Sequence, residues 1–168
     1  VPVVNATTHL AFVRQYSHLP EESDSMIKMR KLAESGDTNS QVNLAVMHYV
    51  SKKGDTSDGL ADRFSFLWNF AAADQNDVGA QAEVGQAYMQ GIGVDPNPAQ
   101  AFTWLSKAAE ANHPKGLGLL GLCHEFGKGT APNKEKATEY YLKASKLGDL
   151  EAMGNLAVQW SSVFRFWE

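Results

Sequence analysis

The chain has a single cysteine among its 168 residues, so no disulfide can form within it. It also lacks an apolar run of the roughly 18–20 residues that a membrane-spanning helix requires. The net charge of −4 gives no excess of positive charge, which argues against nucleic acids and anionic membranes as partners. The unpaired thiol of Cys123 favours a reducing compartment such as the cytoplasm, while a secretory or extracytoplasmic location stays open. The first residue is Val1 rather than methionine, so we expect a processed chain or a segment of a longer protein.

What the sequence does contain is an internal repeat. When residues 78–113 are shifted by 36 positions, they align with residues 114–149: glycines, small residues and aromatic residues fall opposite residues of the same type. The clearest matches are Gly85 with Gly121, Gly91 with Gly127, Gly93 with Gly129, Ala101 with Ala137, Trp104 with Tyr140, and Ala108 with Ala144. A fixed period of this length is typical of a solenoid built from stacked supersecondary units.

A second periodic signal marks the joins between units. Gly36-Asp37, Asn76-Asp77, Asn112-His113 and Gly148-Asp149 follow one another at spacings of 40, 36 and 36 residues. Glycine and asparagine tolerate the left-handed backbone conformation just past the end of a helix. Aspartate is a favoured N-cap for the helix that follows. Each pair therefore predicts one tight junction between two helices.

These two signals divide the chain into consecutive units of two helices. We predict a degenerate or capping pair in residues 1–36, a repeat with a four-residue loop insertion in 37–77, regular repeats in 78–113 and 114–149, and a half repeat in 150–168. The half repeat supplies only a first helix, and its apolar end, Phe164, Phe166 and Trp167, has no second helix to cover it. We expect this end to be covered by further chain, by folding back as a cap, by a partner or by self-association.

The spacing of the regular unit resembles the Sel-one-like repeat (SLR), a relative of the tetratricopeptide repeat. The residues that carry the resemblance are Ala80, Gly85, Tyr88, Gly91, Gly93, Val94, Ala101, Trp104, Ala108 and Ala109. The resemblance covers residues 37–160 and implies an all-α fold, a right-handed superhelix of antiparallel helix pairs. It also implies an adaptor or scaffold for protein–protein interaction. The chain departs from the pattern at His124, which stands at the tyrosine position, and at Ser51 and Lys53, which stand at loop-glycine positions.

Cys123-His124 is the pair that could suggest a nucleophile or a metal site. Adjacent residues of a helix point about 100° apart, so these two side chains do not converge on one ion by themselves. His48 and His124 both occupy the aromatic position of a first helix, where a packed histidine is the preferred interpretation. We therefore predict a noncatalytic protein with no metal and no cofactor, and an enzyme is the least supported alternative.

The leading hypothesis is an adaptor that binds a protein or peptide segment in a concave groove. In a curved stack of helix pairs, the first helix of each pair lines the concave side, and its residues that are not used in packing face a partner. The alternative is a structural or regulatory repeat segment of a larger protein. The candidate partner-binding residues are Asn39, Val42, Val46, Tyr49, Ala82, Gln86, Met89, Gln90, Lys115, Leu122, Glu125 and Phe126.

Overall fold

The computed structural model describes residues 24–51 and 59–164, which form α-helices joined by short turns and loops and contain no strand. The helices are α2 (Asp24–Glu34), α3 (Thr38–Ser51), α4 (Leu60–Asp74), α5 (Val78–Gln90), α6 (Pro98–Glu110), α7 (Pro114–Phe126), α8 (Lys134–Lys146) and α9 (Leu150–Phe164). The first part of the predicted N-terminal unit, residues 1–23, lies outside this description, and so do Phe166 and Trp167. None of the helices in the described ranges is long and apolar enough to cross a membrane.

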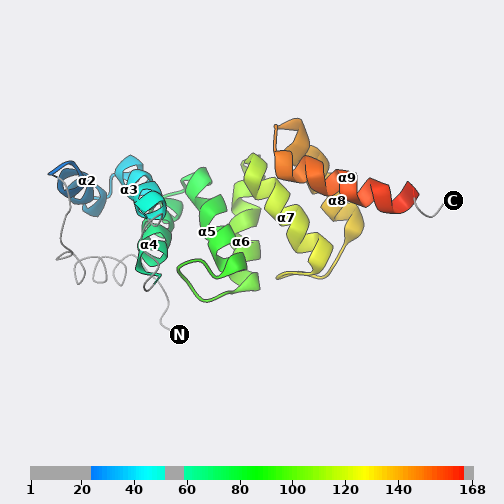
Figure 1. Ribbon diagram of the computed structural model, residues 1–168, viewed down its shortest axis with the longest axis horizontal. Helices are drawn as coiled ribbons and strands as arrows, with labels where there is room; N and C mark the ends of the chain where they lie inside the picture. Colours follow the sequence, from blue (N-terminus) through cyan, green and yellow to red (C-terminus); the bar gives the residue numbers. More distant parts are fainter. Residues whose placement is uncertain (1–23, 52–58, 165–168) are drawn as a thin grey trace.

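The helices form an elongated row with α2 at one end and α9 at the other (Figure 1). α3 packs on α4, α5 on α6 and α7 on α8, and each of these pairs also packs on the next helix along the chain. Every helix therefore contacts its neighbours in sequence, as expected for a repeat protein whose units bury their apolar faces against one another. The prediction of an all-α solenoid of antiparallel helix pairs is confirmed.

The junctions between pairs have the predicted geometry. Gly36, Asn76, Asn112 and Gly148 all have positive φ angles, between 57° and 100°. The side chain of the next residue then accepts a hydrogen bond from the backbone N–H three residues on, at 2.7 Å for Asp37, Asp77 and Asp149 and at 3.4 Å for His113. A left-handed residue followed by an N-cap reverses the chain within two residues, which keeps successive helices antiparallel and in contact.

The loops after α5 and α7 make a second kind of contact between helix pairs. Gly91 and Gly127 end their helices in the left-handed conformation, as the sequence predicts. Gly93 then lies against the carbonyl of Asp62 at the start of α4, and Gly129 lies in the same way against the carbonyl of Pro98 at the start of α6. A Cβ atom at Gly93 or Gly129 would overlap that carbonyl. Each loop therefore rests on the second helix of the preceding pair, a contact that joins pairs in addition to the junctions.

Within a pair, a glycine on the first helix makes room for a large side chain from the second. A Cβ atom built on Gly85 would lie 2.6 Å from Cγ of Leu105, and one built on Gly121 would lie 2.6 Å from Cε1 of Tyr141. Leu105 and Tyr141 are both fully buried. The glycines are therefore needed because the neighbouring helix occupies their side-chain space, and this contact sets the distance between the two helices.

Candidate functional site

Cys123 is a core residue in this fold. Its side chain is fully buried among the apolar residues of α7 and α8. Burial raises the pKa of the Cys123 thiol to about 11, although the positive charge of Lys128 acts in the opposite direction. The thiolate, which is the nucleophilic form, is thus disfavoured at neutral pH. Within residues 24–51 and 59–164, no group of three or more His, Cys, Asp or Glu side chains is placed to hold a metal ion.

His124 packs as an aromatic residue, as predicted. Its ring stacks on Tyr140 with the centroids 5.4 Å apart and meets the edge of Phe102 at 5.6 Å. Burial lowers the pKa of His124, and the positive charge of Lys136 lowers it further. His48 stacks on Phe64 at 4.9 Å, and burial lowers the pKa of His48 as well. Both histidines are therefore held in the neutral form that suits an aromatic packing position.

We expect the free energy of unfolding to decrease as the pH falls below 6.5, the ordinary pKa of histidine. Because the folded-state pKa of His124 lies below that value, the unfolded chain takes up the proton first, and protonation favours unfolding. The loss per histidine has a ceiling of about 1.4 kcal/mol per pH unit within this window, and none is expected above it. Urea unfolding across this pH range measures the slope. His124→Tyr should reduce it, and a variant with the wild-type slope would contradict the assignment.

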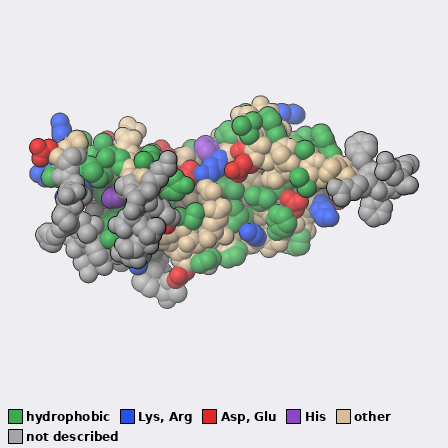
Figure 2. All heavy atoms as spheres, in the orientation of Figure 1, with side chains coloured by type: hydrophobic (Ala, Val, Ile, Leu, Met, Phe, Trp, Pro, Cys, Tyr) green, Lys and Arg blue, Asp and Glu red, His purple; other side chains and the backbone are tan. Residues whose placement is uncertain are grey.

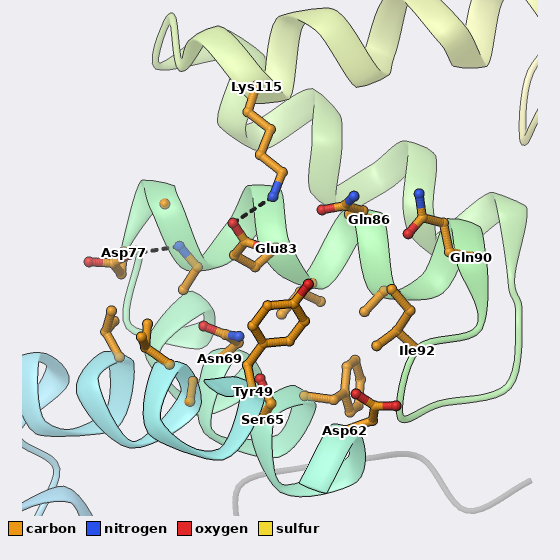
Figure 3. A pocket seen from close by; sticks show the side chains of 18 of the residues that line it. Tyr49, Asp62, Ser65, Asn69, Asp77, Glu83, Gln86, Gln90, Ile92 and Lys115 are labelled. Atoms are coloured by element: carbon orange, nitrogen blue, oxygen red, sulfur yellow. Dashed lines mark hydrogen bonds and ion pairs between the residues drawn. The ribbon is translucent and has the colours of Figure 1, made fainter. Parts of the chain in front are cut away.

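A groove with a volume of about 510 Å³ lies between α3 and α5. Its position follows from how the first helices pack: α5 contacts α7, whereas any contact between α3 and α5 in the described residues is weaker than that one. The space between α3 and α5 is left open above α4, whose residues form the floor. Figure 3 shows Tyr49 of α3 reaching across this space toward α5, with Ser65 and Asn69 of α4 nearby. The apolar lining residues are Val42, Ala45, Val46, Phe66, Ala80, Val84, Ala87 and Ile92.

Six of the twelve candidate partner-binding residues line this groove. They are Val42, Val46, Tyr49, Gln86, Gln90 and Lys115, contributed by α3, α5 and α7. Val46 is 54% exposed and Tyr49 is 60% exposed, so two large apolar side chains stand at the edge of the groove. The helical register of the sequence is thus sufficient to bring this half of the predicted set together.

The other candidates lie elsewhere or serve the fold. Ala82 is fully buried, so its assignment as an exposed groove residue is wrong; α5 packs on α4, α6 and α7 and leaves only a narrow exposed strip. Met89 and Leu122 are half-buried and pack against the core. Glu125 accepts a hydrogen bond from the Tyr141 hydroxyl at 2.6 Å, which ties it to the inside of its own helix pair.

Asn39 and Phe126 are exposed but lie outside the groove. Phe126 is 65% exposed at the end of α7. Further exposed apolar side chains on α9 are Leu150, Met153, Val158 and Trp160. The side chain of Phe164 is outside the described part of the chain, so the predicted self-association through Phe164, Phe166 and Trp167 stays a prediction.

The contribution of α4 to the groove was not predicted from the sequence. Asp62, Ser65 and Asn69 line it from the second helix of a pair, whereas we expected only first helices to do so. A signal was available, because Ser65 and Asn69 are four residues apart in an otherwise apolar stretch. That spacing places two polar side chains on one face of a helix. A wholly buried helix would not carry such a face, because burying polar groups without partners is costly.

The charges around the groove are few and partly paired. Lys115 at the start of α7 donates to Glu83 of α5 at 2.6 Å, and this ion pair links α7 to α5 beside the groove (Figure 3). Asp77 caps α5 at one end of the groove, and Asp62 lies toward the other end. On the face of the molecule in Figure 2, the described Lys and Arg side chains are scattered and do not form one basic patch.

The arrangement of helix pairs defines a helical-repeat solenoid. The comparisons with known proteins identify which kind. Residues 78–113 and 114–149 each match the Sel1 repeat. A Sel1 repeat protein from Oxalobacter formigenes is 30% identical, with a TM-score of 0.64, over 80% of this chain and 98% of that chain. This chain belongs to the Sel1 repeat family, whose members are generally scaffolds for protein interaction.

Two further solved structures are similar. A protective antigen of uropathogenic Escherichia coli that displays an SLR fold is 25% identical, with a TM-score of 0.70; the match covers 94% of this chain and 34% of that chain. Cysteine-rich protein B of Helicobacter pylori is 23% identical over 89% of this chain and 96% of that chain, and its TM-score of 0.52 indicates a shared fold. The comparison with curated proteins gives no match.

Proposed function

We propose that this protein is a noncatalytic adaptor that binds a segment of a partner protein in the groove between α3 and α5. The observation that carries the proposal is the pair of exposed apolar side chains, Val46 and Tyr49, beside the apolar lining that α3 and α5 give the groove. Exposed apolar surface in a concave position is typical of a binding site, because a partner that covers it releases water from both surfaces. Membership of a family of interaction scaffolds supports the same class of function.

The size of the groove favours a segment over the surface of a folded domain. Its volume of about 510 Å³ lies within the range of roughly 300–1,000 Å³ that is usual for ligand sites. Such a space takes a few side chains of a linear segment, which enters a narrow groove more easily than a broad rigid surface does.

The proposal predicts that Val46→Asp weakens binding at least about tenfold, because it puts a charge where an apolar partner side chain is buried. Val50→Asp is the matched control. Val50 is on the same helix and is 58% exposed, against 54% for Val46, but it does not line the groove. The probe is a peptide selected on the wild-type protein from a displayed library of random dodecapeptides. Fluorescence anisotropy with the labelled peptide gives the dissociation constants.

Both variants should keep the wild-type helicity and melting temperature, since both positions are exposed. Equal dissociation constants for Val46→Asp and Val50→Asp would place the bound peptide outside the groove and would contradict the proposal. A library that yields no peptide above background would contradict it as well.

A further inference from the structure

We infer that the segment bound in this groove inserts uncharged, apolar side chains and is recognised without an ion pair. This inference rests on the proposed function and adds the chemistry of the partner. It follows from three properties of the groove: its charged groups already have partners, the ion pair of the neighbouring gap has no counterpart here, and the rest of the lining is neutral.

The charged side chains of the lining are engaged within the protein. Lys115 and Glu83 pair with each other at 2.6 Å. Asp77 caps α5, where its carboxylate accepts a hydrogen bond from the Ala80 N–H at 2.7 Å and lies at the positive end of the helix dipole. Asp62 also has an interaction of its own. In the part of the chain that the structure describes, the lining therefore offers a bound segment no free charge of either sign.

The ion pair that joins α5 to α7 has no counterpart between α3 and α5. The units are related by shifts of 36 and 40 residues, so the position of Lys115 corresponds to Gly79 on α5, and the position of Glu83 corresponds to Asn43 on α3. Neither of these side chains is charged, so no ion pair can cross the gap at these positions. Gly79 itself lines the groove. A space that is bridged by opposite charges in one gap is thus open and neutral in the other.

The walls of the groove penalise a charged side chain of either sign. Ala45 of α3 and Val84 of α5 are fully buried, and Val42 and Val46 extend the same apolar lining along α3. A charged group inserted against them would lose water without gaining a partner, which is costly. An aliphatic or aromatic side chain is favoured there, because burying it releases water from both surfaces.

The remaining polar groups of the lining suit a neutral ligand. His113 is occupied as the N-cap of α7. The neutral side chains that form no hydrogen bond with another described residue are Tyr49, Ser65, Asn69, Gln86 and Gln90. Hydroxyl and amide groups both donate and accept, so they can hydrogen-bond the uncharged amides of a peptide.

The first test places a single charge on the bound segment. The probe is the peptide selected on the wild-type protein, and alanine scanning identifies its anchor, the side chain whose loss weakens binding most. Norleucine at the anchor should keep the dissociation constant within a few-fold, whereas lysine and glutamate should each weaken binding at least about tenfold. Lysine is the matched comparison, since it is norleucine with an added ammonium group. A lysine or glutamate peptide that binds as tightly as the norleucine peptide would overturn the inference.

The second test uncovers one charge of the lining at a time. Lys115→Gln leaves Glu83 without its ammonium partner, and Glu83→Gln leaves Lys115 without its carboxylate. Both side chains are partly exposed, so both variants should keep the wild-type melting temperature.

We expect the lysine peptide to bind several-fold more tightly than the glutamate peptide to Lys115→Gln, and the order to reverse for Glu83→Gln. Raising NaCl from about 0.05 to about 0.5 M should reduce these differences, because salt screens a partly exposed charge. The preference of the wild-type protein for norleucine over lysine should not depend on salt, because it reflects lost hydration. The same order of the two charged peptides for both variants would overturn the inference.

The two proposals fail separately. If Val46→Asp weakens binding more than Val50→Asp does, but the wild-type protein accepts one of the charged anchors, the proposed function stands and only this inference fails. If Val46→Asp binds as well as Val50→Asp does, the proposed function fails, and this inference fails with it.

Discussion

Replacing Gly129 with alanine is expected to lower the free energy of unfolding by about 2–5 kcal/mol, the sum of a backbone cost and a packing cost. Gly129 has a φ angle of 74°, a conformation that costs an L-residue roughly 1–2 kcal/mol. The new Cβ atom would also overlap the Pro98 carbonyl and lie 2.9 Å from Cβ of Phe102. Because the obstacle is backbone at the start of α6, it cannot be relieved by a change of rotamer.

Gly148→Ala is the matched control for this substitution. Gly148 has a φ angle of 90°, but a Cβ atom there would have no neighbour within 4 Å. Its loss should be limited to the backbone cost of about 1–2 kcal/mol. Urea unfolding followed by circular dichroism measures both variants. If the two losses were equal, the loop after α7 would not rest on α6 as tightly as described, and the contact between pairs would contribute little.

The parts of the fold that could be predicted from the sequence are the local ones. The turn at Asn76-Asp77 depends on the conformational preference of one residue and the capping side chain of the next, both of which are visible in the sequence. The contact of Gly93 with α4 is different, because it joins a loop to a helix about thirty residues earlier. The repeat showed that a glycine is required there, but the reason depends on tertiary packing.

The same distinction between local and tertiary determinants applies to the residues of the candidate site. The exposure of Val46 and Tyr49 could be predicted from helical register, because α3 packs chiefly on α2 and α4. Ala82 was misassigned because α5 packs against three helices, and these contacts leave fewer positions exposed than helical register alone predicts. Asn69 was missed because only first helices were expected to line the groove; its spacing from Ser65 marks a polar face on α4, but the gap between α3 and α5 that exposes this face depends on tertiary packing.

Tyr141→Ala is expected to destabilise the protein by about 3–5 kcal/mol, the cost of deleting a fully buried aromatic side chain. The adjacent Tyr140 is the matched control, since it is on the same helix and has the same side chain. Tyr140 is half-buried, and its ring stacks on His124. We expect Tyr140→Ala to cost only about 1–2 kcal/mol, because most of its loss is one aromatic contact and part of its apolar area.

The difference between these two tyrosines tests which of two adjacent repeat positions contributes more to the core: the position of Trp104 and Tyr140, or the position of Leu105 and Tyr141. The 36-residue repeat pairs Trp104 with Tyr140, which draws attention to this aromatic position. The fully buried residues, however, are the next ones along the chain, Leu105 and Tyr141. Tyr141 fits because Gly121 has no side chain, and its hydroxyl reaches Glu125 at 2.6 Å near the edge of the core. Thermal and urea unfolding of the two alanine variants gives the comparison. Equal losses of stability would mean that the Trp104–Tyr140 position contributes as much to packing as the Leu105–Tyr141 position. They would also mean that Gly121 is not needed to accommodate the ring of Tyr141.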